Sequence, residues 1–225
     1  MISKNHNSVD KQTFRNIEFD CMEFNGANFS DNVDFNLCKF NILADFNNCN
    51  FTKGVWYYQC EFKSPILLPY SQVGENIDLR QSSFENLASF EGITVTGNAD
   101  LKGCSFMDQA DFWNSTFVGD FSISDSLFNR DAKFIKSRFI KLADFAKCRF
   151  MATADFSKAV FVESADFSSC LFNESAIFTH SIFEKYANFG DAAFMGNILA
   201  EDGQFKGTIN PLSIGFNIAR LLIVH

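Results

Sequence analysis

A unit of eleven residues repeats without a gap between Ala143 and Phe194. The words Ala-Asp-Phe open three successive units, at Ala143, Ala154 and Ala165, and each unit carries a second Phe five residues after the first. Self-similarity at a fixed period is the signature of a solenoid, in which each unit buries its apolar residues only by stacking on its neighbours. This repeat therefore predicts the architecture more firmly than any other feature of the chain.

Large apolar residues extend the same pattern over most of the sequence. Phe14, Phe19, Phe24 and Phe29 follow one another at intervals of five, and from Phe29 the interval alternates between six and five as far as Phe194. The stretch 64–74 departs from the Ala-Asp-Phe wording, but it keeps the interval without an inserted residue. We therefore expect one solenoid over residues 12–206, preceded by a disordered polar tail over residues 1–11.

A small residue, usually Ala, Cys or Ser, stands two positions before most of the large ones. Side chains two residues apart lie on the same side of an extended backbone. On a helix, steps of five and six residues turn by about 140° and 240°, so the large side chains would scatter around the axis. The pattern therefore favours short strands with an apolar inner side.

These residues resemble the pentapeptide-repeat family, in a variant with one extra residue after every second pentapeptide. The resemblance rests on the recurring Ala-Asp-Phe-x-x-Cys/Ala/Ser-x-Phe and runs from about Phe14 to Phe205. It implies an all-β fold, a right-handed quadrilateral parallel β-helix, here with twenty-two residues in each coil. The resemblance also implies that some relatives dimerise through the end of the chain.

A coil of this length predicts which residues lie above one another, at the strand spacing of about 4.8 Å. One column is aromatic, and it contains Phe40, Phe62, Phe84, Phe106, Phe128, Phe150, Phe172 and Phe194. The small-residue column beside it contains Cys38, Cys60, Ser82, Cys104, Ser126, Cys148, Cys170 and Ala192. We interpret its cysteines as reduced packing residues, since parallel side-chain directions and a cytosolic setting disfavour disulfides.

Composition limits the classes of function. A net charge of -8 argues against direct binding of nucleic acid, which requires Lys and Arg to neutralise phosphates. The sequence shows neither a signal peptide nor an apolar run long enough to span a membrane, so a cytoplasmic protein is the expectation. The seven Cys form no CxxC pair and no His stands at metal-ligand spacing, so we expect no metal and no cofactor.

Two charged columns are expected on the outside of the coil. Asp78, Asp100, Asp144 and Asp166 share one column, for which we weigh a solvated face against a partner-binding acidic face. Asp111, Lys133 and Asp155 alternate in sign in the second column, which suggests a salt ladder. A cluster of basic residues between Arg130 and Arg149 is expected to spread around the circumference as a belt.

Residues 207–225 are expected to form a short C-terminal helix, with Asn210 as its N-cap and Pro211 in its first turn. Its apolar residues include Leu212, Phe216, Leu221 and Leu222, which must be buried somewhere. Three interpretations remain open: a cap over the last coil, a homodimer interface, and association with a membrane surface. The segment is too short to span a membrane.

No catalytic constellation stands out, because the only His residues are His6, His180 and His225 and no Gly-rich phosphate loop is present. The leading hypothesis is a non-enzymatic scaffold that presents a flat surface to an unidentified protein partner. The resemblance supplies an alternative, a DNA-mimicking protein that binds a type II topoisomerase (gyrase) and protects it from fluoroquinolones. A secreted or membrane-associated effector is the third class.

Overall fold

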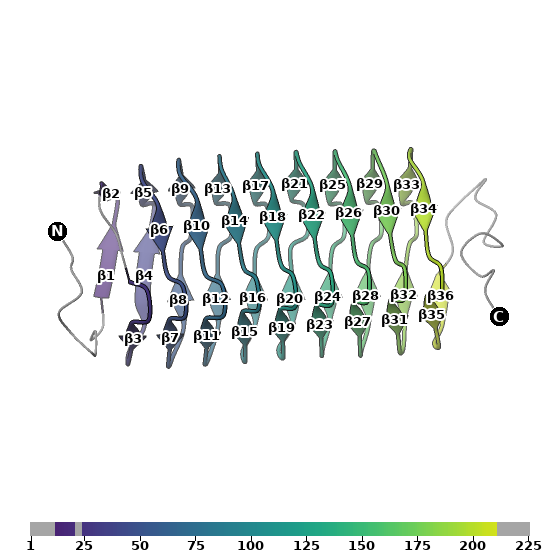
Figure 1. The fold of residues 1–225 in the computed structure, drawn as a ribbon, viewed down its shortest axis with the longest axis horizontal. Helices are drawn as coiled ribbons and strands as arrows, with labels where there is room; N and C mark the ends of the chain where they lie inside the picture. The colour runs from purple at the N-terminus through teal and green to yellow at the C-terminus, as the bar shows by residue number, and fades with distance from the viewer. Residues whose placement is uncertain (1–11, 21–23, 211–225) are drawn as a thin grey trace.

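The computed structural model describes residues 12–20 and 24–210, and within them the chain forms 36 short parallel strands and no helix. The strands wind into a solenoid of about nine coils whose axis runs horizontally in Figure 1. Most strands have two residues, because a turn or bend follows each of them. The all-β prediction is confirmed for the described part of the chain.

Four parallel sheets run along the solenoid, and each coil contributes one strand to each sheet in its regular part. Sheet I contains β1 (Gln12–Arg15), β4 (Val33–Asn36), β8 (Val55–Trp56), β12 (Ile77–Asp78), β16 (Ala99–Asp100), β20 (Phe121–Ser122), β24 (Ala143–Asp144), β28 (Ala165–Asp166), β32 (Ala187–Asn188) and β36 (Ile209–Asn210). Sheet II contains β2 (Glu18–Phe19), β5 (Lys39–Phe40), β9 (Glu61–Phe62), β13 (Ser83–Phe84), β17 (Ser105–Phe106), β21 (Leu127–Phe128), β25 (Arg149–Phe150), β29 (Leu171–Phe172) and β33 (Ala193–Phe194).

The other two sheets complete each coil. Sheet III contains β6 (Ala44–Asp45), β10 (Ile66–Leu67), β14 (Ala88–Ser89), β18 (Ala110–Asp111), β22 (Ala132–Lys133), β26 (Ala154–Asp155), β30 (Ala176–Ile177) and β34 (Ile198–Leu199). Sheet IV contains β3 (Asn28–Phe29), β7 (Asn50–Phe51), β11 (Gln72–Val73), β15 (Thr94–Val95), β19 (Thr116–Phe117), β23 (Arg138–Phe139), β27 (Val160–Phe161), β31 (Ile182–Phe183) and β35 (Gln204–Phe205).

The strand register confirms a coil of twenty-two residues. Phe106 pairs with Phe84 on one side and with Phe128 on the other, and Phe128 pairs in turn with Phe150. The ring centroids of Phe106 and Phe128, and of Phe128 and Phe150, lie 4.8 Å apart with nearly parallel planes. The predicted aromatic column of sheet II is therefore present.

The first coil is one residue shorter, since Phe14 pairs with Phe35 and Phe19 pairs with Phe40. From β3 onward the offset is twenty-two, as in the pair of Phe29 with Phe51. This difference explains the early run of five-residue intervals. It also extends the aromatic column of sheet II by one ring, to Phe19, whose centroid lies 5.1 Å from that of Phe40.

The small-residue positions do more than fill space. Cys49, Cys104, Cys148 and Cys170 are fully buried, and each thiol donates a hydrogen bond to a carbonyl oxygen twenty-five residues earlier, at Sγ–O distances of 2.9 to 3.1 Å. Ser126 does the same with its hydroxyl, which lies 3.1 Å from the Leu101 oxygen. Each such bond ties one coil to the previous one. The six cysteines of the described residues are free, as expected.

One corner of the chain recurs every eleven residues in a left-handed backbone conformation. Seventeen consecutive positions from Gly26 to Asp202 have φ between 53° and 72°, and only three of these are glycine. A residue with a side chain is disfavoured there by roughly 1 to 2 kcal/mol, so the stacked coils must impose this geometry. The sequence pattern of Phe and Ala gave no sign of it.

The end of the solenoid differs from the expectation in one respect. Ile209 and Asn210 form β36 and pair with Ala187 and Asn188, so the coil continues past residue 206 as far as Asn210. The segment for which Asn210 was predicted as the N-cap lies outside the described residues. The other residues predicted to form the C-terminal helix, including Leu212, Phe216, Leu221 and Leu222, lie outside the described residues. The same holds for the predicted tail over residues 1–11.

Candidate protein-binding surfaces

The four aspartates chosen from the sequence lie on the outside of sheet I, in one column. Asp78 pairs with Asp100, and Asp144 pairs with Asp166. Ser122 stands between the two pairs, next to Asp100 on one side and Asp144 on the other. The column therefore carries two separate pairs of carboxylates.

Each of these carboxylates has a role in the fold. One oxygen accepts a hydrogen bond from the backbone N–H two residues later, at N–O distances of 2.8 to 3.2 Å, and so closes the turn after its strand. Asp144 also accepts a bond of 2.8 Å from the Ser122 hydroxyl. Local bonds of this kind are a reason for Asp to recur at turns. The Asp of the Ala-Asp-Phe wording is thus explained by turn geometry before any partner is considered.

Asp78 is the most enclosed of the four, with 6% of its surface exposed. Its two carboxylate oxygens bind the guanidinium of Arg80, and Asp78 Oδ2 lies 2.6 Å from Arg80 Nη2. Arg80 also lies 3.6 Å from Asp100 and 5.5 Å from the centre of the Tyr58 ring. The hydrogen bonds that Arg80 donates to Asp78 raise the pKa of Arg80. The negative charge of the pair Asp78 and Asp100 is therefore partly neutralised by Arg80.

The predicted salt ladder of sheet III differs from the ion pairs that the structure contains. Asp111, Lys133 and Asp155 do share a column of sheet III, but the ion pairs found among the described residues lie elsewhere. In sheet II, Lys39 Nζ lies 3.7 Å from Glu18, and Lys63 contacts both Glu61 and Glu85. Exposed pairs of this kind contribute at most about 1 kcal/mol each.

The basic residues between Arg130 and Arg149 are spread around the coil as expected. Lys133 belongs to sheet III, Arg138 to sheet IV and Arg149 to sheet II. They therefore form a belt of single charges and no concentrated basic patch.

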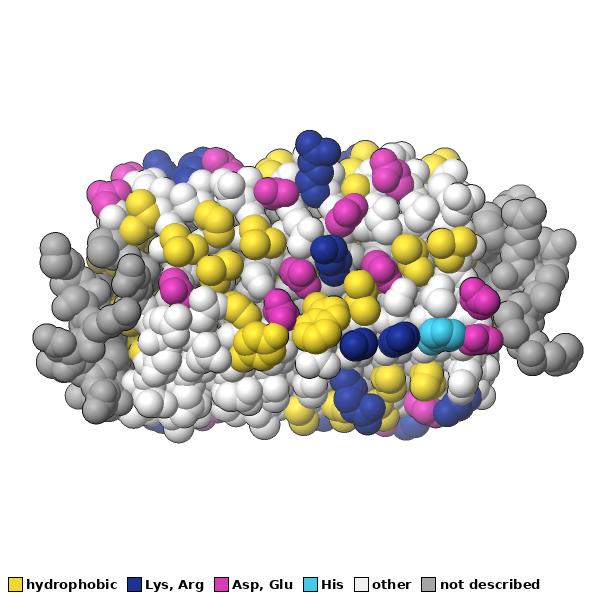
Figure 2. All heavy atoms as spheres, viewed as in Figure 1, with side chains coloured by type: hydrophobic (Ala, Val, Ile, Leu, Met, Phe, Trp, Pro, Cys, Tyr) yellow, Lys and Arg dark blue, Asp and Glu magenta, His cyan; other side chains and the backbone are white. Residues whose placement is uncertain are grey.

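An apolar surface on sheet III was not anticipated from the sequence. Leu43, Pro65 and Leu87 occupy equivalent positions in three successive coils, directly before β6, β10 and β14, and Leu67 lies on the outside of β10. Leu43 is 40% exposed and the nearby Tyr70 is 51% exposed. Figure 2 shows apolar side chains gathered over this part of sheet III. We call these five residues the apolar patch.

The apolar patch has a simple origin in the sequence. Positions on the outside of the coil are polar in most units, but the stretch 64–74 places Pro65, Leu67 and Tyr70 there. Tyr70 stands at one of the left-handed corners, with a φ of 56°. Its ring lies over Gly92, where an added Cβ would come within 2.6 Å of the ring. The departure of residues 64–74 from the Ala-Asp-Phe repeat is the signal in the sequence from which the apolar patch could have been found.

Metal ligands and histidine are the remaining features of the described residues that bear on chemistry. No group of three His, Cys, Asp or Glu side chains in that part of the chain could hold a metal ion. His180 is exposed, and its Nδ1 lies 3.3 Å from Asp202 Oδ2. No helix of the described part is long and apolar enough to cross a membrane.

The buried thiols are held mostly in their neutral form. Burial raises the pKa of Cys49 to about 12, and it raises the pKa values of Cys104, Cys148 and Cys170 as well. Cys38 is the exception, because its hydrogen bond with the Cys60 thiol lowers its pKa. Both sulfurs are nevertheless enclosed, since Cys38 and Cys60 are each 1% exposed. These groups act in packing and hydrogen bonding.

Comparison with known proteins adds the following. No curated protein matches the chain. Among solved structures, a trypsin-treated variant of QnrB1, described as a plasmid-mediated fluoroquinolone resistance protein, is 15% identical, with 90% of this chain and 91% of that chain covered and a TM-score of 0.37. Full-length QnrB1 is 14% identical, with 90% and 93% covered and a TM-score of 0.26.

A family model described as pentapeptide repeats (9 copies) matches residues 24–65, 79–127 and 156–198. These segments make up more than half of the chain. The chain belongs to the pentapeptide-repeat family.

Proposed function

We propose that the solenoid is a non-enzymatic scaffold that binds a protein partner through the apolar patch on sheet III. The observation that carries this proposal is the exposure of Leu43 and Tyr70, at 40% and 51%, beside Leu67 and Leu87. Outward side chains do not contribute to the stacked core, so the fold does not require apolar residues at these positions. Contiguous exposed apolar surface on a folded protein commonly marks an interaction site.

The winding of the scaffold is part of the proposal. Four sheets with one strand each per coil agree with a four-sided tube. Crossovers between parallel strands are right-handed in the great majority of proteins. We therefore propose the right-handed, quadrilateral form that the resemblance implies.

A matched pair of variants tests the patch. Leu43→Asp combined with Leu87→Asp places two charges on the apolar patch, whereas Leu142→Asp alters a single exposed leucine, 42% exposed, next to sheet I. Quantitative affinity capture from the native host should recover a partner with the wild type and with Leu142→Asp, but not with the double variant. Circular dichroism should be the same for all three proteins. Equal recovery of every partner by the double variant would contradict the proposal.

The acidic column of sheet I supports a second candidate, binding to a topoisomerase in place of DNA. Asp144 and Asp166 have no Lys or Arg partner among the ion pairs of the described residues, in contrast to Asp78. A negative face can steer a protein that normally binds DNA. In a gyrase supercoiling assay, the wild type should change the rate of supercoiling and Asp144→Lys with Asp166→Lys should abolish the effect.

The control for this second candidate is Asp155→Lys, which changes the charge of sheet III and leaves sheet I intact. A wild-type protein without any effect on supercoiling, at all concentrations tested, would exclude the topoisomerase interpretation. That result would leave the apolar patch as the remaining interaction surface.

A further inference from the structure

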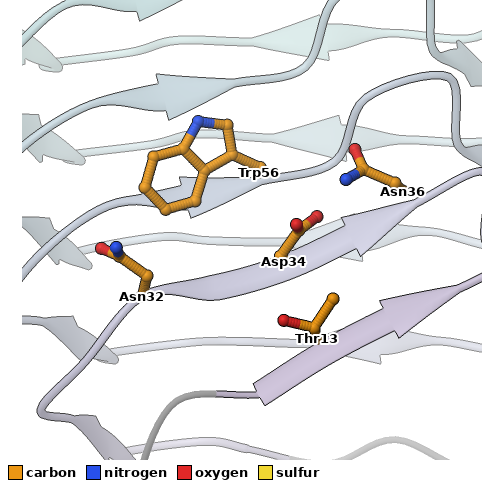
Figure 3. Close-up of a pocket in the computed structure, with 5 residues that line it drawn as sticks. All are labelled: Thr13, Asn32, Asp34, Asn36 and Trp56. Atoms are coloured by element: carbon orange, nitrogen blue, oxygen red, sulfur yellow. The ribbon is translucent and has the colours of Figure 1, made fainter.

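A hollow of about 270 Å³ lies on the outside of sheet I near the amino-terminal end of the solenoid, and Thr13, Asn32, Asp34, Asn36 and Trp56 line it (Figure 3). Thr13, Asp34 and Trp56 are direct neighbours on β1, β4 and β8. Asn32 and Asn36 stand two residues to either side of Asp34, so their side chains leave the same face of the sheet. Five side chains from three coils therefore meet at one place.

Trp56 lies flat against the sheet. An added Cβ at Gly54 would come within 2.6 Å of the indole Cη2 and 3.0 Å of Cζ2, so the six-membered ring covers the glycine. Asn32 holds the same glycine from the other side, because its Oδ1 accepts a hydrogen bond of 3.3 Å from the Gly54 N–H. With one face of the ring against the backbone and Trp56 half-buried as a whole, the exposed part of the ring can contact a ligand.

The groups around the indole have complementary hydrogen-bonding capacity. The Asp34 carboxylate accepts, the Asn36 amide donates and accepts, and the Thr13 hydroxyl does both. The amide nitrogen of Asn32 still has two N–H donors, since its oxygen is the atom that binds Gly54. An aromatic face surrounded by such groups suits a ligand with an apolar face and a rim of hydroxyls. The electron-rich face of the ring attracts polarised C–H groups.

We propose that this hollow binds a single pyranose residue, whose C–H face packs on Trp56 and whose hydroxyls bind Asp34, Asn36 and Asn32. The hollow is slightly smaller than the usual range for ligand pockets, which fits one sugar ring and not a longer chain. The inference does not depend on the apolar patch, which belongs to a different sheet.

A cationic ligand is disfavoured by comparison with the next site on the same sheet. There, Arg80 stacks on Tyr58 and contacts two carboxylates, Asp78 and Asp100. The hollow at Trp56 contains one carboxylate and three neutral polar groups instead. Neutral groups in this number favour a neutral, hydroxyl-rich ligand over a guanidinium or an ammonium.

The experiment uses the fluorescence of Trp56 in the full-length chain. The protein has two tryptophans, so Trp113→Phe leaves Trp56 as the only reporter. This variant is titrated with the methyl pyranosides of glucose, galactose and mannose, and with N-acetylglucosamine. Sorbitol serves as a polyol without a ring face, and tetramethylammonium serves as a cation. At least one pyranose should give a saturable change with a dissociation constant of about 1 to 10 mM, typical of a small weak site.

Asp34→Ala and Asn36→Ala, each in the Trp113→Phe background, keep the reporter and remove hydrogen-bonding groups. Each should weaken binding about 10-fold, the factor expected from the loss of one or two hydrogen bonds, whereas Asn50→Ala on sheet IV should leave it unchanged. Binding of an oligosaccharide about as tightly as its methyl pyranoside would assign the ligand to the terminal residue of a glycan, and binding of the methyl pyranoside alone would assign it to a free sugar. No saturable change with any pyranose, a response shared with sorbitol, or a response to tetramethylammonium alone would overturn the proposal.

Discussion

Two parts of the solenoid solve the same packing problem with different side chains. From Phe128 to Phe194, every large inner position is Phe and every small position is Ala, Cys or Ser, without exception. Between Ile66 and Leu101 the large positions include Leu, Val and Phe. We call them the Phe-rich part and the mixed part. The strand register is twenty-two residues in both.

The mixed part compensates for its smaller residues at the neighbouring position. Ile66 and Ile77 occupy small positions, and Leu68 and Leu79 occupy the large positions two residues later. The Phe-rich part usually has Ala and Phe at these two positions. All four of these residues are at most 2% exposed. Cores tolerate hydrophobic changes that conserve volume, so the fold depends on the combined volume of each pair and not on Phe itself. The exposed residues of the mixed part also supply most of the apolar patch.

The largest expected effect comes from emptying one large position in each part. Phe145 contacts several rings, among them Phe134 at 5.1 Å and Phe167 at 4.8 Å, so Phe145→Ala should reduce the free energy of unfolding by about 4 kcal/mol. Leu79→Ala in the mixed part should cost about 3 kcal/mol. Urea denaturation followed by circular dichroism measures both. A greater loss at Leu79 would contradict the view that ring contacts add stability to the Phe-rich part.

Phe121 and Ile123 permit a sharper test, because they place the large residue at the usual small position and the smaller one after it. Phe121→Ala should destabilise by about 3 kcal/mol and Ile123→Phe by about 1 to 3 kcal/mol. The double variant restores the common wording and should lie within about 1 kcal/mol of the wild type. Additive losses in this double-mutant cycle would show that volume is not exchanged within the pair.

Alkaline pH tests whether the buried thiols of the Phe-rich part behave like those that flank the mixed part. Burial raises the folded-state pKa of Cys148 and Cys170, so the neutral thiols contribute stability below an unfolded pKa of 9.0, and this contribution is lost as the pH rises above it. Between pH 9 and pH 10, each buried thiol should lower the free energy of unfolding by about 1 kcal/mol. Cys148→Ser with Cys170→Ser should therefore make the fall in unfolding free energy shallower by about 2 kcal/mol over that interval.

The matching variant is Cys49→Ser with Cys104→Ser, which changes two thiols of raised pKa that lie on either side of the mixed part. A similar change of slope is expected, since serine occupies equivalent positions at Ser82 and Ser126. Identical pH profiles for the wild type and both variants would show that the thiols are not the groups responsible.

The smallest expected effect concerns the turn aspartates. Asp144→Ala removes the acceptor of the Ala146 N–H and of the Ser122 hydroxyl, and it should cost about 1 kcal/mol. Asp144→Asn keeps an acceptor oxygen and should stay within about 0.5 kcal/mol of the wild type, as the Asn188 amide plays this role in a later coil. Thermal unfolding compares the two. A loss as large for Asn as for Ala would assign the effect to charge instead of turn geometry.

The inner side of the coil could be predicted from the sequence, because the spacing of the buried residues can be read directly from it. Phe and Ala recur at fixed intervals, and the step of twenty-two residues follows from counting alone. The left-handed corners could not be predicted in this way, since Lys136, Leu37 and Tyr70 have no shared chemistry. Their conformation is set by the stacked coils and not by local preference.

The outer surface was predictable only in part. The aspartate column followed from the register, but the turn bonds that occupy its carboxylates depend on backbone geometry that no residue pattern shows. The hollow at Trp56 needs residues from three coils, and Gly54 has no meaning until the indole is seen to lie on it. Surface sites of a solenoid arise between coils, where sequence neighbours are not spatial neighbours.

The corner that returns every eleven residues has a consequence for how such a chain can change its length. Adding or removing twenty-two residues would leave every outer column continuous. Adding or removing eleven would preserve the local backbone but rotate all later residues halfway around the axis. Strands that now extend sheet I would then extend sheet III, and the acidic and apolar faces would be recombined in a single step.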